Sequence, residues 1–487
     1  MFYAERPDSL EAALQTTDEQ PCFPLPLAPF EAYMLADHRP DYPMHFYIGM
    51  HFSGALDRER FRQALTEAIK RHPLLRARIR QRFGRSPVWE SGTGVCLREC
   101  ARGFDDLSEV QQAAEIDLTV ETGLRTWLYA KPAEAQVLFE FHHSCCDGLG
   151  ALVFLEDVLV AYDRIVRGMP TEQNAVRVSE LRRRAAIPLS VGQAVRKIPL
   201  DVQDFFRILF RRPAIVAESV PSADIVDRAD ITSTQSEDGT QSAGGTQSQD
   251  GDGRSAVLSH RFGTAELNAL LTESRAQSAT LNSLLMKAVY QSLDQWMSRN
   301  GDTGHRWIRM GVPASTRADR QAATSCCNQV TIMFLDQHSR EIRQGESLLT
   351  RVTEQTRFHR DSNIWYSMLQ LLDFLAVVPP LLRLYLRANR RMCTTIVSNV
   401  GRAFEACTLP RTDGRLKAGD LQLTGLNFLS PLRPGTEVTF GIVTYAGTLS
   451  LNMHYKPQRI AEPEARRLFE QLVRNILDSA DVPNSQR

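Results

Sequence analysis

The stretch that decides the fold is "FEFHHSCCDGLG", residues 139–150. Two adjacent histidines, His142 and His143, end an alternating apolar run, "AQVLFEFHH", and Asp147 follows shortly afterwards. Because the side chains of a strand alternate between its faces, the two histidines point to opposite sides. The next residues, "ALVFLEDVLVAYDRIVRG", have helical spacing. The sequence therefore predicts a strand that ends at the histidines, a short loop, and a helix capped by Asp147.

Four explanations of the histidine pair are open at this point. A metal site is disfavoured because the two rings diverge and no second cluster of histidine and cysteine completes a ligand set. A nucleophile at Cys145 or Cys146 would require a separate base, and vicinal free cysteines are more often small buried residues. The pair could also be ordinary core residues, with Asp147 only capping the helix. The fourth explanation is a general base, His143, because a usual imidazole pKa of about 6.5 suits proton abstraction.

The composition is that of a globular protein, with 43% hydrophobic and 23% charged residues in 487. The 57 basic and 57 acidic side chains balance, so we expect no nucleic-acid partner. The first residues lack the pattern of a signal peptide, and no stretch reaches the roughly 18 apolar residues of a spanning helix. Nine cysteines, four of them in vicinal pairs, do not fit a secreted disulfide framework. We therefore expect a cytoplasmic protein.

One low-complexity segment divides the chain. Three tandem TQSxxG hexads occupy residues 234–251, and a stretch so poor in aliphatic side chains cannot bury enough surface to fold. We predict a flexible linker over 216–255, between an N-terminal lobe, 1–215, and a C-terminal lobe, 256–487. Each half opens with an alternating strand, "MHFYIGMHF" or "AVLSHRF", followed by a segment of helical spacing. This pattern predicts an α/β sandwich of two related lobes.

The segment "HHSCCDG" fits the HHxxxDG signature of the CoA-dependent acyltransferase superfamily. That superfamily includes condensation domains, wax ester synthase/diacylglycerol acyltransferases and chloramphenicol acetyltransferase-like enzymes. Other segments resemble the family in the same order along the chain: "PLAPFEAYMLADHR", "LTEAIKRHPLLRARI", "SATLNSLLMKAV", "MGVPASTR", "CCNQVTIMF" and "TTIVSNVGR". Two departures are that Cys327 replaces a glycine and that "SNVGR" lacks the usual Pro-Gly-Pro turn.

The resemblance implies two chloramphenicol acetyltransferase-like lobes with an active-site tunnel between them. It implies an acyltransferase in which His143, the second motif histidine, acts as general base without an acyl-enzyme. Asp147 matches a structural aspartate that pairs with an arginine of the second lobe, here Arg317. His142 would pack behind the loop, and Gly148 matches the motif glycine. The residues expected to line the tunnel are Asn282, Asn328, Ser398 and Asn399.

The resemblance implies no bound cofactor and no metal. The acyl donor would be acyl-CoA, or alternatively a phosphopantetheinyl thioester on an acyl carrier protein, and the acceptor a small alcohol or amine. A non-catalytic binding module of the same fold is the alternative from another class. The apolar stretch 367–386 and the arginines after it suggest a buried helical hairpin, an acyl-chain wall or an interfacial segment, so peripheral contact with a membrane is left open.

Overall fold

The fold is known from a computed structural model. It describes residues 22–82, 85–92, 94, 96–104, 110, 113–171, 178–187, 189, 191–216, 255–299, 305–317, 326–344, 347–377 and 391–480. The predicted linker therefore lies outside the described residues except at its two ends.

Seven strands form the first sheet, in which all neighbours are antiparallel except β5 and β6. Their spatial order is β12 (Arg411–Thr412), β13 (Arg415–Ala418), β14 (Leu421–Leu429), β2 (His45–Ser53), β7 (Glu134–His142), β6 (Leu124–Ala130) and β5 (Cys96–Glu99). The predicted alternation in β2 is confirmed, because Phe46, Ile48 and Met50 all lie in one apolar core.

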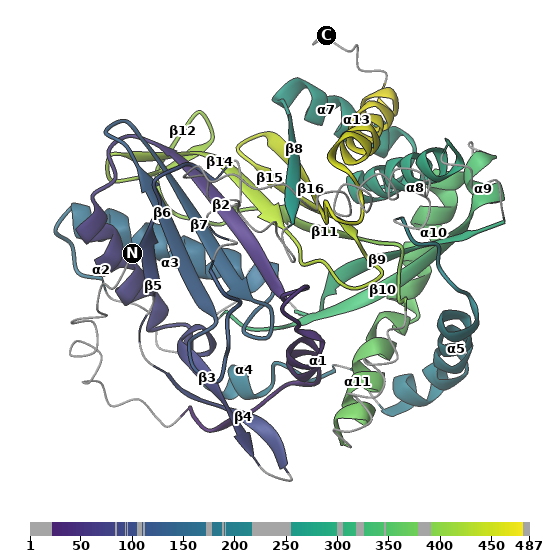
Figure 1. The fold of residues 1–487 in the computed structure, drawn as a ribbon, viewed down its shortest axis with the longest axis horizontal. Coiled ribbons are helices and arrows are strands. Elements are labelled where there is room, and N and C mark those ends of the chain that lie inside the picture. The colour runs from purple at the N-terminus through teal and green to yellow at the C-terminus, as the bar shows by residue number, and fades with distance from the viewer. Residues whose placement is uncertain are drawn as a thin grey trace, which may run out of the picture.

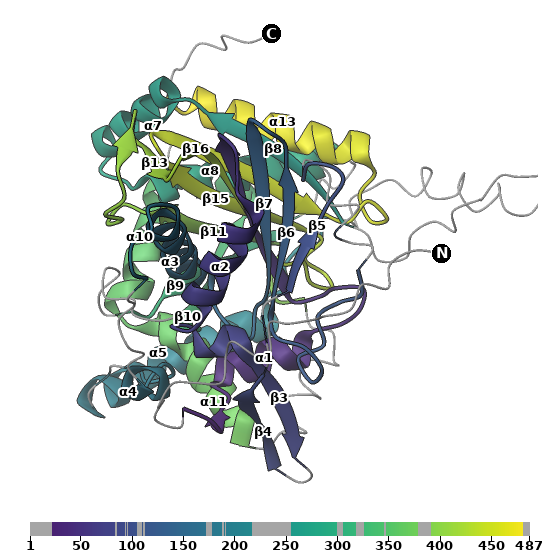
Figure 2. The ribbon, with the colours of Figure 1, turned by 90° about the vertical axis from the view of Figure 1, so that its left-hand side faces the viewer.

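Two helices, α2 (Arg58–Ile69) and α3 (Gly148–Val166), cover one face of this sheet and complete that core. Figure 2 shows the sheet nearly edge-on with both helices on the same side. Each helix begins at an aspartate: Asp57 accepts a hydrogen bond from the backbone of Arg60 at 3.0 Å, and Asp147 accepts one from Gly150 at 2.8 Å. The predicted helix cap at Asp147 is therefore present.

Six strands form the second sheet. Their order is β10 (Val330–His338), β9 (Trp307–Ser315), β11 (Thr395–Arg402), β15 (Val438–Tyr445), β16 (Thr448–Tyr455) and β8 (Ala256–Phe262). The helices that pack with it are α7 (Thr264–Ala276), α8 (Leu281–Arg299), α9 (Ser339–Arg343), α10 (Leu348–Asp361) and α13 (Glu462–Asp478). In Figure 1 they lie on the side of this sheet that faces away from the first one.

The two sheets touch where β14 passes β15. The approach is so close that a Cβ atom on Gly441 would lie 2.0 Å from the carbonyl oxygen of Phe428. Any side chain at this position would push the sheets apart, so glycine is required for the contact. The chain is thus a two-lobed α/β protein, as the sequence predicts, with a direct junction between its sheets.

Sheet membership does not follow the predicted lobe boundaries. Strands β12 to β14 come from the second half of the chain, but they complete the first sheet. Helix α5 (Val191–Phe210) precedes residue 216, but Arg207 donates a hydrogen bond to Asp336 of β10 at 2.7 Å. The division at 1–215 and 256–487 stays a prediction, and sheet membership crosses it on both sides, because strand alternation shows that a segment is a strand and not which sheet it joins.

Smaller elements complete the structure. A third sheet has the order β1 (Leu25–Pro26), β4 (Arg85–Ser91) and β3 (Ala77–Arg82). The remaining helices are α1 (Pro29–Asp37), α4 (Val178–Arg182), α11 (Ser367–Val377) and the 3-10 turns η2 (Pro73–Arg76) and η6 (Ile364–Tyr366). The predicted hairpin over 367–386 is described only as far as α11. Within the described residues, every helix is too short or too polar to cross a bilayer.

Candidate active site

The motif loop begins at the end of β7, next to the start of β2. His142 is the last residue of β7 and pairs with His45. The backbone N–H of His143 donates to the carbonyl of Met44 at 2.7 Å, and the N–H of Cys145 donates back to the carbonyl of His142 at 2.9 Å. The loop is therefore a tight turn fixed to both strands, and α3 starts immediately after it.

His143 lines a cavity between the two sheets, which we call the histidine cavity. Its wall includes Phe46 and Phe428 from the first sheet and Pro313 and Ile332 from the second. Most of the exposed wall is apolar, and the open space is about 80 Å³. A base in such a space is shielded from bulk water but accessible to a bound substrate.

The surroundings of His143 favour a neutral imidazole. Burial lowers the pKa of His143, and its own carbonyl and the charge of Asp147 only partly oppose this effect. Its ring lies 5.1 Å from that of Phe46 and 6.5 Å from that of Phe30, in edge-to-face orientation. The Nδ1 atom is buried and has no hydrogen-bond partner among the described residues. The imidazole is therefore uncharged at neutral pH and able to accept a proton.

Asp147 forms the predicted ion pair with Arg317. Arg317 Nη1 donates to Asp147 Oδ2 at 2.8 Å, and the two side chains are 3% and 5% exposed. The same carboxylate oxygen accepts the N–H of Gln329 at 2.8 Å, and Arg317 Nη2 donates to the carbonyl of Cys327 at 2.9 Å. Asp147 raises the pKa of Arg317 despite the opposing effect of burial. The pair therefore ties the motif loop to the second sheet, although the buried Nε of Arg317 has no hydrogen-bond partner among the described residues.

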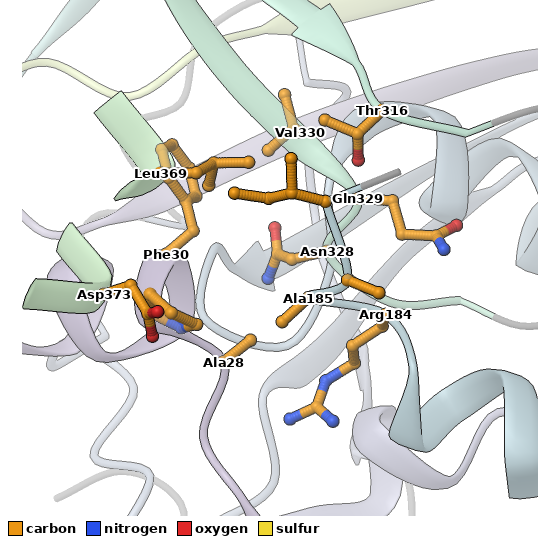
Figure 3. Close-up of a pocket in the computed structure, with 13 residues that line it drawn as sticks. Ala28, Phe30, Arg184, Ala185, Thr316, Asn328, Gln329, Val330, Leu369 and Asp373 are labelled. Atoms are coloured by element: carbon orange, nitrogen blue, oxygen red, sulfur yellow. The ribbon is translucent and has the colours of Figure 1, made fainter. Parts of the chain in front are cut away.

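Asn328 also holds the loop. Its Nδ2 donates to the carbonyls of His143 and Ser144 at 2.8 and 2.9 Å, whereas its buried Oδ1 has no partner among the described residues. Asn328 projects into a second cavity of about 230 Å³, between Phe30 and Leu369 on one side and Ala185 on the other (Figure 3). We call this the asparagine cavity. One of the residues expected to line a tunnel is thus in place.

The two cavities adjoin one another. Both are lined by Phe30 and Val330, so these side chains form the wall between them. His143 of the motif loop lines the histidine cavity, whereas the asparagine cavity meets the loop through Asn328, which bonds its carbonyls. This arrangement suits a reaction in which two substrates meet at one base.

The other expected lining residues divide into two groups. Ser398 lines the histidine cavity. Asn282 and Asn399 instead bond to each other, with Asn399 Nδ2 donating to Asn282 Oδ1 at 3.2 Å, and neither is among the described residues that line the two cavities. Asn399 Oδ1 also accepts the N–H of Gly401 at 2.8 Å, inside β11 where the pairing with β15 shifts its register. For this pair a lining role stays a prediction, and the contact seen is between the two amide side chains.

Steric crowding explains why residue 148 is a glycine. A Cβ atom at this position would lie 2.7 Å from Cγ1 of Val400 and 3.3 Å from the ring of Phe428. A side chain there would displace the two residues and fill the histidine cavity, which Gly148 also lines. The motif glycine therefore lets α3 start against the second sheet.

The cysteines of the loop are packing residues, as the sequence predicts. Cys145 and Cys146 are fully buried in the core of the first sheet. Burial raises the pKa of both thiols well above the usual value, which opposes thiolate formation. A Cβ atom on Gly123 would lie 2.0 Å from Cys145 Sγ, so the sulfur fits against the glycine. Neither cysteine has the environment of a nucleophile.

His142 lies on the opposite side of the strand, in a cluster that sequence reasoning missed. It stacks on His38 with ring centroids 4.8 Å apart and meets His45 edge-on at 5.6 Å. Nitrogen atoms of the three rings lie within 4.8 Å of one another, close enough to hold a metal ion. The argument that no histidine set exists is therefore wrong, because His38 and His45 are distant from the motif in sequence.

Hydrogen bonds fix the protons of this cluster. The N–H of Ser144 donates to His142 Nδ1 at 3.1 Å, and the N–H of Met44 donates to His38 Nδ1 at 3.3 Å. Both neutral rings therefore carry their proton on Nε2, so a metal would have to displace these protons. Burial and the neighbouring rings lower the pKa of His142 well below its usual value, and burial is the main cause that lowers the pKa of His38 to about 4. His142 and His38 are therefore uncharged at neutral pH.

Two further contacts support the loop and were not predicted. Arg184 Nε donates to the fully buried Glu31 at 2.6 Å, and Glu31 is next to Phe30 of the cavity wall. His72, from the predicted His-Pro helix end, accepts the N–H of Cys326 at 2.9 Å and bonds Asp157 at 2.8 Å. A sequence signal existed for the second contact, in the His-Pro segment, and none for the pair of Arg184 and Glu31.

Comparison with known proteins confirms the predicted resemblance. Residues 32–180 match the family model of the Condensation domain. A probable nonribosomal peptide synthetase of Salinispora arenicola, CymA, is 29% identical over 170 residues, which represent 31% of this chain and 2% of that protein. The chain thus spans a very small part of the curated relative that it matches.

Solved structures extend the resemblance to nearly the whole chain. The first condensation domain of the CDA synthetase has a TM-score of 0.66 at 14% identity, over 95% of this chain and 97% of that one. The TRI3 trichothecene 15-O-acetyltransferase of Fusarium sporotrichioides has a TM-score of 0.65 at 13% identity, over 93% and 94%. The chain therefore has the two-lobed fold shared by condensation domains and CoA-dependent acyltransferases.

Proposed function

We propose that this protein is an acyltransferase that moves an acyl group from a thioester to a hydroxyl or amine, with His143 as general base. The observation that carries the proposal is the position of a half-buried, neutral His143 in an apolar cavity between the sheets. A second cavity adjoins the first and gives a second substrate its own approach. Support also comes from the fold, which is that of a 15-O-acetyltransferase and a condensation domain.

In the proposed reaction, the acceptor oxygen or nitrogen attacks the carbonyl carbon of the thioester. His143 takes the acceptor proton as the new bond forms. The carbon–sulfur bond then breaks, and the proton passes from His143 to the departing thiolate. No acyl-enzyme is required, and the cavity contributes by holding both substrates near the base.

Asp147 and Arg317 act as positioning residues in this scheme. Their ion pair, together with the bonds from Asn328 to the loop carbonyls, fixes the segment that presents His143. A loop held at several points leaves the base little freedom to turn away from the cavity. Proximity effects depend on such fixed geometry.

For the donor we favour acyl-CoA, and a carrier-protein thioester is the alternative. Both present the same pantetheine thioester, so the site chemistry is shared and only the partner differs. A small alcohol or amine completes the reaction in either case. The chemistry proposed here uses no metal and no bound cofactor, and a cytoplasmic location remains a prediction.

The test is a thioester-release screen with the purified full chain. Free thiol is measured with acyl-CoAs of increasing length, and with the same acyl groups on a carrier protein, in the presence of alcohol or amine acceptors. We expect acceptor-dependent release that is lost in His143→Ala and kept in His51→Ala, a histidine that lies in a different cavity. Absence of release with every donor would favour the non-catalytic binding module. Release at the parental rate by His143→Ala would refute the assignment of the base.

A further inference from the structure

Exposed hydrophobic side chains gather on three neighbouring helices. Among the described residues, ten large hydrophobic side chains are strongly exposed, and eight of them lie on α5, α10 and α11. The six on α5 are Val195, Ile198, Val202, Phe205, Phe206 and Phe210, and the others are Phe358 of α10 and Phe374 of α11. The ring of Phe206 lies 5.8 Å from that of Phe205 and 5.7 Å from that of Phe210. Such a concentration marks an interaction site.

Helix α5 is turned the opposite way from an ordinary surface helix. All its charged residues except Arg196 contact the protein: Lys197, for example, is 3% exposed and donates to Gln370 of α11 at 2.7 Å. Arg207 donates to Asp336 at 2.7 Å. A surface helix normally buries its apolar stripe and exposes its charges. Here the polar contacts hold the helix on the protein and the apolar stripe faces outward.

Buried Arg309 fixes the end of α5 in this orientation. Its guanidinium donates to the carbonyls of Arg207, Ile208 and Arg211 at 3.2–3.3 Å, and it pairs with Asp336 at 2.6 Å. Because these carbonyls lie at and just beyond the last turn of the helix, rotating α5 to bury its stripe would break their bonds to Arg309. The outward orientation is therefore built into the fold, and the stripe needs an apolar partner from outside.

The charges around the stripe indicate the partner. The exposed ionisable side chains described between residues 181 and 212 are all arginines: Arg182, Arg183, Arg196, Arg211 and Arg212. The acidic residues of α5, Asp201 and Asp204, are paired with Lys197 and Arg207. A second copy of this chain would bring the same arginines against each other, so self-association through this face is electrostatically opposed.

We propose that the exposed face of α5, with Phe374 of α11, docks on an anionic lipid bilayer. An amphipathic helix of about 20 residues with aromatic and aliphatic side chains on one face and arginine beside it suits the boundary between headgroups and acyl chains. Anionic headgroups would meet the arginines. In the ribbon views α5 lies at an outer edge of the molecule, at the lower right of Figure 1 and the lower left of Figure 2.

The position of this face also bears on the substrate. Leu369 and Asp373 of α11 and Ile187, just before α5, line the asparagine cavity. Docking through α5 and α11 brings the bilayer next to this cavity, so a membrane-dissolved acyl donor or acceptor would enter from the lipid. This second step rests on the proposed acyltransferase function, whereas docking itself does not.

The first test is flotation of the full chain with vesicles of phosphatidylcholine alone or mixed with phosphatidylglycerol. We expect binding to the mixed vesicles and a loss of about tenfold or more in partition coefficient for the double variant Phe206→Ser/Phe210→Ser. The matched control is Val120→Ser/Met169→Ser, which removes the two exposed hydrophobic side chains outside the three helices and should bind like the parent. Equal binding by both double variants, or no binding by the parent, would overturn the proposal.

The second test separates charge from apolar contact. Arg196→Gln/Arg212→Gln should weaken binding to phosphatidylglycerol vesicles several-fold per arginine. Exposed arginines elsewhere, Arg402→Gln/Arg466→Gln, serve as the control and should have little effect. Light scattering provides the competing outcome: a parental dimer that Phe206→Ser/Phe210→Ser converts to monomer would show that a second copy covers the face.

Activity measurements distinguish a failure of the docking proposal from a failure of the proposed acyltransferase function. With a water-soluble short-chain acyl-CoA, all four surface double variants should turn over at the parental rate, because none touches either cavity. Vesicle binding without any thioester release would leave docking intact and remove the acyltransferase. Release without vesicle binding would do the reverse.

Discussion

The two motif histidines are neighbours in sequence but lie in regions of different chemistry. His143 faces an apolar cavity between the sheets, and its Nδ1 is unpaired among the described residues. His142 lies across the strand among imidazoles, and its Nδ1 accepts a backbone hydrogen bond. A strand end separates them because consecutive side chains take opposite faces.

This difference indicates where the chemistry should be sought. A buried polar atom without a partner costs free energy, so an unpaired nitrogen in a folded protein requires a reason. A base that must accept a proton from a substrate supplies that reason. Nδ1 of His142 has a hydrogen-bond partner, and the contacts of His142 stabilise the loop and the junction of β2 and β7. We therefore expect changes at the two positions to affect different measurements.

The largest effect should come from His143→Ala. Removing a general base typically costs about 10²–10⁴-fold in rate. The thermal midpoint should change little, because the lost ring borders a cavity and its Nδ1 has no hydrogen-bond partner among the described residues. Acceptor-dependent thiol release at saturating donor measures the first quantity, and circular dichroism the second. If unfolding accounted for the lost rate, the distinction between the two histidines would fail.

The second-largest effect should come from the ion pair of Asp147 and Arg317, which holds the motif loop. Asp147→Asn and Arg317→Gln should each destabilise the protein by about 3–5 kcal/mol, since each leaves one buried charge uncompensated. The double variant should lose much less than the sum, and urea unfolding of all four proteins measures the coupling. The exposed pair Arg466–Glu462 is the control, with an expected coupling of about 1 kcal/mol or less. If the stability losses of Asp147→Asn and Arg317→Gln simply added in the double variant, the two side chains would not be energetically coupled.

Local signals in the sequence predicted the motif region well. The alternation before His142 fixes the diverging rings, and the helical spacing after Asp147 fixes the cap. Arg317 came from the resemblance, and its contact with Asp147 is present. These features depend on a few consecutive residues or on a shared family pattern, so one sequence suffices to find them.

Long-range register was not predictable in the same way. His45 faces His142 because β2 and β7 pair antiparallel with this register, which no local pattern specifies. Asn282 and Asn399 were expected in the tunnel, but they meet across 117 positions of sequence. The outward face of α5 depends on Arg309, about a hundred residues away along the chain. Periodicity identifies an amphipathic helix but not which side the protein will hold.

A smaller effect should separate the two roles of the His142 ring. His142→Leu fills similar space but leaves the N–H of Ser144 without an acceptor, which should cost about 1–3 kcal/mol of stability. His142→Asn can offer its side-chain oxygen near the position of Nδ1 and should lose less. Urea denaturation compares the two variants, and both should keep much more activity than His143→Ala. If Leu and Asn were equally destabilising, the hydrogen bond would not be what His142 contributes.

The smallest effect is a pH dependence of stability that arises on the His142 side. Burial, and then His45, lower the pKa of His38 to about 4 in the folded protein, against about 6.5 in an unfolded chain. As the pH falls below about 6.5, the unfolded state binds the proton first, so the free energy of unfolding decreases until about pH 4. The carboxylates of Glu115 and Asp117 oppose the shift, and His142 titrates in the same direction as His38.

His38→Gln removes this proton uptake and should give a shallower decrease of the free energy of unfolding between pH 6.5 and 4 than the parent shows. The exposed His305→Gln is the matched control and should follow the parent. Urea unfolding at a series of pH values measures how steeply the free energy of unfolding falls in each protein. The difference between the two slopes cancels the contributions of all other titrating groups.

Activity measured over the same pH series tests His143. Because burial lowers the pKa of His143, the acidic limb of kcat/KM should lie below pH 6.5 in both proteins. Parallel stability curves for His38→Gln and the parent would show that His38 does not titrate in this range. The surroundings of His142 and of His143 would then differ in geometry but not in this pH dependence.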